Sequence, residues 1–515
     1  MSNGDIEAAW TYHNSTKHSV ASIRATRHSL DWEIKPQPFK VYPDLEPLAL
    51  PRELPPARVA ALTAIAQETG ATRETDVVPD LVSLSRLLHF SAGIIQRKVY
   101  PGGEEMYFRA AACTGALYHI DVYVICGDLP GLSAGVYHFG PHNFALHELR
   151  TGDYRGSIVQ ATASEPAIQH APAILACTST YWRNSWKYQA RAYRHCFWDC
   201  GTILANLFAV AAADGVPARL VCGFVDGAIN SLLGLDTARE ATLALVALGR
   251  VPQAASPPPP EIPAISHRTL PLSPREVDYP AIRQVHAASS LLAPEEVQAW
   301  RAARPSHRAV VTAPPSGRLF PLRPVEKDAS SSDSIDNVIR RRGSSRRFSL
   351  ETLQLGQLAT LLERTACGVD SDFASWFKEV YLIVQAVEGL PTGSYVYHPE
   401  DEAVELLKEG DFRRQAGFLG LGQDLPAEAA VNFYFMCDLA AALTRFGNRG
   451  YRLAQLEAAI GGGKVYLAAY ALGLGATGLT FFDDDVTEFF SPHAAGKSVM
   501  FLVAVGHPRR TLPLA

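Results

Sequence analysis

Closely spaced arginines and hydroxyls form the sharpest chemical feature of this sequence, in the run RRRGSSRRF from Arg340 to Phe348. Guanidinium groups donate paired, charge-assisted hydrogen bonds to phosphate oxygens, and hydroxyl groups add further donors. The run therefore suits the binding of a phosphate monoester. Taken alone, it fits a solvated basic turn equally well.

Two further segments could take part in chemistry. Lys187 and Tyr188 stand side by side in WRNSWKYQARAYR, and a positioned Lys–Tyr pair can transfer a proton or stabilise an anion. A surface lysine beside a packed tyrosine is the commoner arrangement. The run AACTGALY, from Ala111 to Tyr118, contains small residues that let a backbone approach a flat ligand closely, although a plain strand-entry loop would look the same.

Two other patterns predict no chemistry. The glycines from Gly473 to Gly478 match the spacing G-x-G-x-x-G, but they follow a predicted helix and precede a strand, the reverse of a dinucleotide-binding loop. His195, Cys196 and Cys200 have helical spacing inside a long apolar segment, and no second pair of ligands is near in the sequence. We interpret them as core residues and expect no metal site.

The elements that must position these candidates occur twice. Gly135–Arg155 aligns without a gap with Gly393–Arg413, which lies 258 positions later, and eight of the 21 aligned residues are identical. The same offset aligns the helical segments that begin at Arg191 and Arg449. One offset shared by separate segments indicates an internal duplication.

Each copy shows the same order of predicted elements, in which strands and short helices surround one long apolar helix. The long helices are expected at about residues 193–213 and 451–471, each followed by a glycine. This order predicts an α+β fold, a mostly antiparallel sheet flanked by helices. Copy one is expected at residues 1–250 and copy two at 334–515. A Pro- and Ser-rich linker with one helix, Pro294–Ala303, would join them at 251–333.

Bulk composition excludes several classes of protein. Apolar residues make up 47% of the 515 residues and charged residues 19%, which predicts globular domains rather than disorder. The net charge of -5 gives no reason to expect a nucleic-acid partner. The eight scattered cysteines, the lack of a signal core and the lack of an uninterrupted apolar run of membrane-spanning length predict a cytoplasmic protein with reduced thiols and no membrane partner.

Motifs of copy one resemble the nitroreductase superfamily, and in particular its SagB-type dehydrogenases. Those enzymes have the patterns PSAGALYP, GVYHYxP and KYGxRGYRY where this chain has AACTGALYH, GVYHFGP and KYQARAYRH. The resemblance covers nearly the whole chain. It departs in the first motif, where Ala112, Cys113 and His119 replace Pro, Ser and Pro. It implies a duplicated nitroreductase-like domain whose two copies form an intrachain pseudo-dimer.

By the same resemblance, the two copies would build one FMN site between them. In nitroreductases one subunit supplies an Arg-x-Ser-x-Arg/Lys phosphate loop, a strand edge after the long helix and a basic C-terminal tail, and the other supplies a small-residue loop over the flavin. The matching cofactor-binding residues in copy two are Arg342, Ser344, Arg346, Gly478, Thr480, Phe481 and Arg509, with Arg510 beside the last. Those in copy one are Cys113, Thr114, Gly115 and Leu117, with Lys187 and Tyr188 as catalytic candidates. The reverse set would need His18 and Ser19 with a loop near Asp372, and has lost most of the pattern.

The resemblance implies an FMN-dependent oxidoreductase that dehydrogenates an azoline or a peptide-derived heterocycle by hydride transfer to flavin N5. Lys187 and Tyr188 would bind or deprotonate this small-molecule or modified-peptide substrate. The duplication removes the need for a homodimer without forbidding one. Two alternatives stay open: an NAD(P)H-dependent nitro or quinone reductase of the same fold, and a flavin-free scaffold or peptide-binding partner in a biosynthetic complex.

Overall fold

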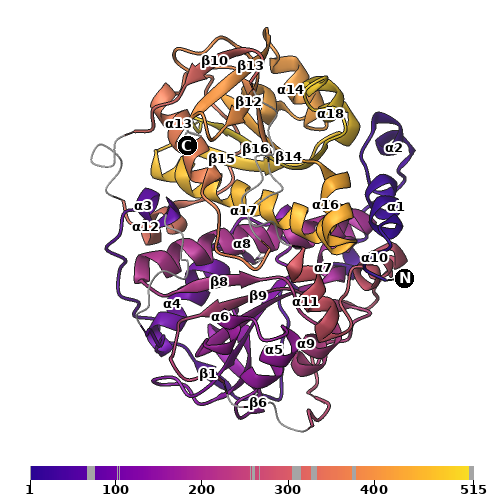
Figure 1. Cartoon of the computed structure of the whole chain (residues 1–515), viewed down its shortest axis with the longest axis vertical. Coiled ribbons are helices and arrows are strands. Elements are labelled where there is room, and N and C mark those ends of the chain that lie inside the picture. Colours follow the sequence, from indigo (N-terminus) through magenta and orange to yellow (C-terminus); the bar gives the residue numbers. More distant parts are fainter. Residues whose placement is uncertain are drawn as a thin grey trace.

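Two similar halves, each built on a seven-stranded antiparallel sheet with helices packed against it, make up the described part of the chain (Figure 1). The computed structural model describes residues 2–66, 76–100, 103, 105–255, 257, 261–265, 267–303, 315–325, 333–373 and 379–509. The two strand orders are β1-β6-β5-β4-β7-β9-β8 and β10-β13-β12-β11-β14-β16-β15, so equivalent strands occupy equivalent places. The predicted duplicated α+β fold is thereby confirmed.

The strands of the two sheets have closely similar lengths. The first sheet contains β1 (Pro47–Ala49), β4 (Ile120–Cys126), β5 (Gly135–Gly140), β6 (Ala145–Thr151), β7 (Ala173–Thr180), β8 (Ala218–Val221) and β9 (Glu240–Leu248). The second contains β10 (Arg318–Pro321), β11 (Glu379–Val384), β12 (Gly393–His398), β13 (Ala403–Glu409), β14 (Val431–Cys437), β15 (Gly475–Leu479) and β16 (Ser498–Gly506). A separate hairpin, β2 (Ile94–Val99) and β3 (Glu105–Arg109), belongs to the first half.

The helices also repeat. Those of the first half are α1 (Glu7–Ser15), α2 (Val20–Ala25), α3 (Ala61–Ala66), α4 (Leu81–Ala92), α5 (Arg155–Ala161), α6 (Pro166–Gln169), α7 (Tyr181–Tyr188), α8 (Ala192–Asp214) and α9 (Asp226–Leu233), with short 3-10 turns η1 (Trp32–Ile34), η2 (Thr114–Ala116) and η3 (Gln189–Arg191). The later ones are α10 (Pro280–Ala288), α11 (Pro294–Ala302), α12 (Ile335–Arg341), α13 (Leu355–Ala366), α14 (Arg413–Leu419), α15 (Asp424–Glu428), α16 (Leu439–Phe446), α17 (Arg449–Ala471) and α18 (Asp483–Phe490). The two long helices thus lie where the sequence predicted them.

Helices α8 and α17 lie side by side where the halves meet (Figure 1). A Cβ atom built on Gly201 would lie 2.6 Å from Cβ of Ala459, and one built on Gly463 would lie 2.6 Å from Cβ of Ala205. Each pair joins a residue to its own repeat equivalent, 258 positions later. A residue can meet its equivalent only on a twofold axis, so a pseudo-twofold axis runs between the two helices, which are parallel.

The apolar character of α8 belongs to this core. The stretch Tyr181–Asp214 is long and apolar enough to cross a membrane, but 89% of its most apolar window is buried inside the protein. A helix that is apolar on all sides must be covered on all sides, here by α17, the first sheet and neighbouring helices. The structure therefore accounts for this segment without a membrane.

Two reciprocal ion clusters tie the halves together at one end of these helices. In the first, Arg194 of α8 donates to Asp483 of α18 (Nη1–Oδ1 2.6 Å), beside a second bond from Arg191. In the second, Arg452 of α17 donates to Asp226 of α9 (Nη1–Oδ1 2.7 Å), beside a second bond from Arg449. Each cluster joins arginines of one half to a carboxylate of the other, and all these side chains are buried.

The stretch 251–333 takes part in the same symmetry. Arg194 also donates to His13 O, within α1, and to Thr16 Oγ1, directly after α1. Arg452 donates in the same way to His286 O and to Ser289 Oγ, at the end of α10. Strand β10 likewise pairs with β13 as β1 pairs with β6.

Helix α10 and strand β10 therefore occupy places equivalent to α1 and β1, and α11 follows α10 in the chain as α2 follows α1. We propose that the fold of copy two extends back to the start of α10, although the sequence predicts a linker there. The run at 256–260 and the residues 326–332 of this stretch lie mostly outside the described residues.

Candidate functional site

The predicted phosphate loop begins with a buried guanidinium group. Arg342, directly after α12, donates from Nε to Ala110 O at 3.0 Å and from Nη2 to Arg109 O at 3.1 Å. Its side chain is 9% exposed, and burial lowers its pKa. Among the described residues no carboxylate forms an ion pair with it. Arg342 thus links copy two to the backbone just before the small-residue loop of copy one.

The rest of the predicted loop lies along β15. Ser345 N donates to Ala476 O at 3.0 Å, and Ser344 Oγ lies 3.3 Å from Tyr466 Oη. The Tyr466 hydroxyl also accepts a hydrogen bond from Gly478 N. Tyr466, on α17, therefore joins the loop to the strand edge that the sequence assigned to the same ligand.

The basic residues at the ends of this region lie at the surface. Arg346 and Arg509 are both exposed, and Arg509 N donates to Arg347 O at 3.1 Å. The backbone of the predicted basic tail therefore runs beside the phosphate loop. Arg510 lies outside the described residues.

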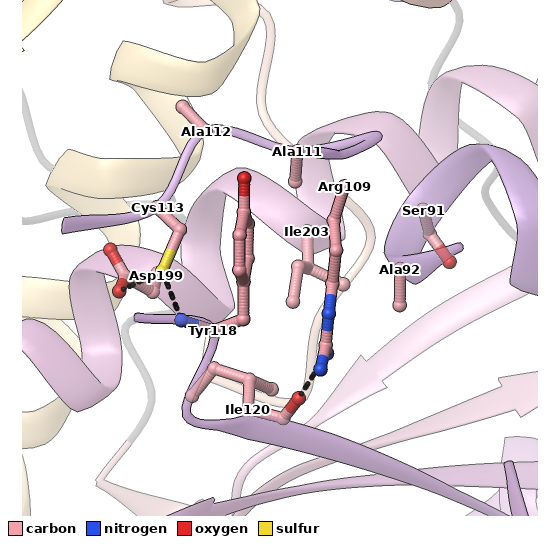
Figure 2. Close-up of a pocket in the computed structure, with 10 residues that line it drawn as sticks. All are labelled: Ser91, Ala92, Arg109, Ala111, Ala112, Cys113, Tyr118, Ile120, Asp199 and Ile203. Atoms are coloured by element: carbon pink, nitrogen blue, oxygen red, sulfur yellow. Dashed lines mark hydrogen bonds between the residues drawn. The ribbon is translucent and has the colours of Figure 1, made fainter. Parts of the chain in front are cut away.

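In copy one the small-residue loop is held by Asp199 of α8 (Figure 2). The carboxylate accepts from Thr114 N at 2.9 Å, from Thr114 Oγ1 at 2.7 Å and from Cys113 Sγ at 3.0 Å. His119 Nε2 is 2.7 Å from it. The loop needs this support because Gly115, Ala116 and Tyr118 have positive φ angles of 64°, 55° and 48°.

Cys113, His119 and Asp199 bring their ligand-type atoms within 4.8 Å of one another. Hydrogen bonds account for each of them, because Cys113 Sγ also accepts from Tyr118 N and His119 Nδ1 lies 2.8 Å from Ser179 Oγ. With Tyr118 and Arg109, Cys113 and Asp199 line a cavity of about 10 Å³, in which the Tyr118 ring stands between Cys113 and Arg109 (Figure 2). We interpret the cluster as a clamp on the loop.

The predicted catalytic pair meets this loop through Tyr188. A Cβ atom at Gly115 would lie 2.8 Å from Tyr188 Oη, so a glycine is required there by contact as well as by its φ angle. Burial raises the pKa of Tyr188, and the nearby Asp199 and Cys113 raise it further. Lys187 is exposed, with Nζ 5.4 Å from the centre of the Tyr188 ring.

A row of rings connects Tyr188 to the strand edge of copy two. The ring centres of Tyr188 and His195 are 4.6 Å apart, those of His195 and Trp198 4.8 Å, and those of Trp198 and Phe481 5.8 Å. Next to Phe481, the Oγ1 atom of Thr480 is buried and has no hydrogen-bond partner among the described residues. The predicted residues of both copies therefore border one region.

Leu117 departs from this arrangement. It is half-buried and packs against a separate apolar cluster that includes Ile34, Trp182 and Trp186. Its side chain thus contacts the outer part of the first half, whereas Cys113 and Thr114 are bound to α8.

Sequence reasoning did not find Asp199, Tyr466 or Trp198, the residues that connect the predicted ones. All three lie on the long apolar helices, where the sequence pattern indicates core packing. Asp199 gave the only available signal, an acidic residue within a run of otherwise apolar helix.

His18, which the predicted reverse set includes, lies beside α18 of copy two. His18 donates from its backbone N to Asp483 Oδ2 at 2.8 Å, and burial lowers the pKa of its imidazole to about 3. Helix α3 is the element that corresponds to α12, because α3 and α4 precede α12 and α13 by the same 274 positions. The residues that follow α3, 67–75, lie outside the described residues, so the predicted reverse set with His18 and Ser19 stays a prediction.

The family model of the nitroreductase family matches residues 81–250 and again 339–507, together more than half of the chain. The crystal structure of a protein from Anabaena variabilis, assigned as a nitroreductase, is 27% identical and superposes with a TM-score of 0.78 over 98% of this chain and 99% of that chain. A protein of Methanocaldococcus jannaschii, also assigned as a nitroreductase, is 25% identical over 147 residues, 28% of this chain and 73% of that protein. An FMN-dependent nitroreductase from Clostridium difficile is 13% identical, with a TM-score of 0.24, over 33% of this chain and 86% of that one.

Proposed function

Because this chain belongs to the nitroreductase family, and is therefore a nitroreductase-type oxidoreductase, we propose that it binds one FMN between its halves and uses it to dehydrogenate a small heterocyclic or modified-peptide substrate. The observation that carries this proposal is Arg342. A buried cation without a carboxylate partner is costly, so its presence favours an anion as the missing partner.

The residues around Arg342 fit the cofactor. Ser344 and Ser345 follow it in a loop along β15, and the buried Oγ atom of Ser345 has no hydrogen-bond partner in the part of the chain that the structure describes. The unpartnered Oγ1 of Thr480 lies further along the same edge. Arg342, Ser344 and Arg346 would hold the phosphate, and Gly478, Thr480 and Phe481 would face the ring system, with Arg509 at the rim.

Copy one would supply the cover. Cys113, Thr114 and Gly115 present backbone and small side chains in a loop that Asp199 keeps in a strained conformation. A rigid, preformed loop lets a flat ring bind without a further cost of ordering. We assign Leu117 a role in anchoring this loop, since it packs in the neighbouring cluster.

FMN held at this site would supply the two-electron redox chemistry, and residues of copy one would bind and orient the substrate. Tyr188 keeps its proton at neutral pH, because burial raises its pKa, so its hydroxyl would donate a hydrogen bond to the substrate. Lys187 stands exposed beside the Tyr188 ring, where its charge would bind an electronegative atom of the substrate. The azoline or peptide-derived heterocycle is proposed from the SagB-type motifs of copy one.

The first experiment asks whether the purified full chain carries flavin. We expect a yellow protein with flavin absorbance bands and FMN in the denatured supernatant by mass spectrometry. Anaerobic mixing with an azoline-containing peptide should bleach the flavin bands. A colourless protein that cannot be reconstituted with FMN would contradict the proposal and favour the flavin-free scaffold.

A nitro or quinone reductase is the second candidate, and the relatives assigned as nitroreductases favour it. The discriminating measurement is flavin reduction by NAD(P)H followed by turnover with a quinone or a nitroaromatic compound. If NAD(P)H bleaches the flavin and azoline peptides never do, this second function replaces the first.

A further inference from the structure

Because of the pseudo-twofold axis, the region between the halves occurs twice, and each element at one place has a counterpart at the other. We define the first interface site by Thr114, Tyr188, Arg191, Thr480 and Phe481. The equivalent residues define the second interface site: Asp372, Phe446, Arg449, Gly223 and Phe224. The last two lie 257 rather than 258 positions from their counterparts, because Arg449 lies over the Phe224 ring as Arg191 lies over the Phe481 ring. Because the two places are built from equivalent elements, they can be compared directly.

At the second interface site a carboxylate closes the strand edge. Asp372 accepts hydrogen bonds from Cys222 N at 2.9 Å and from Gly223 N at 2.7 Å, and it is fully buried. Its backbone N also donates to Leu220 O, so this loop of copy two is bound to β8 of copy one. Cys222 and Gly223 belong to the edge that is equivalent to the edge of Thr480 and Phe481, which is proposed to face the flavin ring.

A tryptophan fills the space in front of this edge. Trp300 of α11 lies against Gly223, where an added Cβ atom would be 2.7 Å from its ring. The same ring lies 5.5 Å from the ring of Phe446 and 6.0 Å from the guanidinium of Arg449. Phe446 and Arg449 correspond to Tyr188 and Arg191, so Trp300 occupies the middle of the second interface site.

Helix α11 is fixed in this position from both halves. Arg301 donates to Thr162 O at 2.7 Å and pairs with Glu165 at 3.1 Å in copy one. Arg445 of copy two donates to Ala303 O at 2.6 Å. With these contacts α11 buries Val297 completely and Trp300 to 5% exposure.

The equivalent helix at the first interface site has a different position. Helices α2 and α11 begin 274 positions apart, so Ile23 corresponds to Val297. Ile23 is 37% exposed, and α2 has no buried residue. Figure 1 shows α2 at the edge of the molecule, whereas α11 lies against its body. Helix α2 thus buries none of its side chains, whereas α11 places Trp300 inside the second interface site.

We propose that the chain seals its second interface site with Trp300 and Asp372, and takes up flavin and substrate only at the first. The identity of the ligand rests on the proposed function; the sealing does not. Gene duplication would then have produced one active site and one permanently filled counterpart. Helix α11, which lies in the stretch where the sequence predicts a linker, supplies the tryptophan that fills it.

The sealing is tested without any ligand by a matched pair of cysteine variants, Ile23→Cys and Val297→Cys. The native full-length variants are treated with a thiol reagent, and the labelled peptides are quantified by mass spectrometry. We expect rapid labelling at position 23 and strong protection at position 297. Equal labelling rates would overturn the proposal.

A second comparison tests the tryptophan itself. Trp300→Ala in the Val297→Cys background should increase labelling at position 297, and Trp300→Phe should preserve protection, because a ring still fills the space. Unchanged protection in Trp300→Ala would overturn the role of Trp300. If the Ala variant does not fold, the native pair and the Phe variant still decide.

Flavin counting then separates this inference from the proposed function. After reconstitution and gel filtration, we expect about one FMN per chain, lost in Arg342→Ala and retained in Trp300→Phe. Two FMN per chain would overturn the sealing while leaving the proposed function intact. No FMN at all would overturn the proposed function, and the cysteine pair would still decide the sealing.

Discussion

Arg342 is the residue for which the proposed site makes the strongest demand. Its guanidinium is buried against two carbonyls of copy one, Arg109 O and Ala110 O. If it binds phosphate, Arg342→Ala should weaken FMN binding by about 1.5–3 kcal/mol, the scale of a charged hydrogen bond. Fluorescence titration of FMN into the apo-protein measures the change in Kd.

Arg341→Ala is the matched control for this prediction. Arg341 is the preceding residue, is exposed and pairs with Asp333 rather than with copy one. Its loss should leave FMN affinity nearly unchanged, because exposed ion pairs contribute little. Equal losses in both variants would mean that only the general positive charge of the run matters.

Asp199 should act by positioning. Asp199→Asn keeps the size of the side chain but replaces one carboxylate oxygen by a donor, which cannot accept the bonds from Thr114 or Cys113. We expect about 1–3 kcal/mol lower unfolding free energy in urea. FMN affinity should fall as well, since the loop is no longer held. An unchanged Kd in a destabilised variant would show that the loop does not contact the flavin.

The sequence predicted some of these residues and not others for a physical reason. Arg342 and Gly115 belong to short motifs whose residues are close together in the sequence, so the sequence alone shows them. Asp199 and Tyr466 act from the long helices. Asp199 binds Thr114, which lies 85 positions away, and Tyr466 contacts Ser344, which lies 122 positions away. Trp300 lies in a stretch whose composition indicates a linker, and only the fold shows what it faces.

At the scale of elements, the crossing of α8 and α17 should be the most sensitive packing contact. Gly201→Leu would place a side chain where Cβ of Ala459 is already 2.6 Å from an added Cβ. Overpacking of this kind costs about 1–3 kcal/mol, and more where the backbone must move. Urea unfolding followed by circular dichroism gives the loss.

Gly227→Ala provides the control for that substitution. Gly227 lies in α9, where an added Cβ meets no atom within 4 Å. Because alanine favours the helix over glycine, this variant should be unchanged or more stable by up to about 1 kcal/mol. A loss as large as that of Gly201→Leu would indicate a general sensitivity to glycine replacement rather than a close helix crossing.

The order of helices and strands was largely predictable from the sequence, but which elements contact one another was not. Apolar periodicity placed the long helices within one or two residues, at Ala192–Asp214 and Arg449–Ala471. Helices α1 and α10 gave no such signal of their role. Their function, to bind Arg194 and Arg452 through His13 O and His286 O, depends on backbone atoms that no sequence motif specifies.

For the whole molecule, the two ion clusters predict a defined loss of stability in acid. The guanidinium groups of Arg449 and Arg452 lower the pKa of Asp226 from 3.8 to about 2 against the effect of burial. A carboxyl whose pKa is lower in the folded state stabilises the fold above its unfolded pKa, and this contribution disappears as the pH falls through the folded pKa. Stability should therefore fall between about pH 4 and pH 2.

Asp226→Asn isolates this contribution from that of other carboxylates. The variant should be less stable at neutral pH by about 3 kcal/mol or more, because two buried arginines lose their counter-charge. The difference in urea midpoint between the native chain and the variant should then shrink as the pH is lowered towards 2. A difference that stays constant with pH would show that the cluster stabilises by packing alone.

The pairs on the pseudo-twofold axis have one more consequence. Gly201 faces Ala459, and Ala205 faces Gly463, so each contact combines one methyl group with none. An assembly of two identical chains would have to choose glycine on both sides, which leaves a void, or alanine on both sides, which crowds the backbones. When one gene encodes both helices, the two sides of the contact can mutate separately. Here each contact has a glycine on one helix and an alanine on the other. In the single chain, the contact between α8 and α17 therefore does not have to be formed by two identical surfaces. For the same reason, the two interface sites can differ, with the first proposed to bind ligands and the second filled.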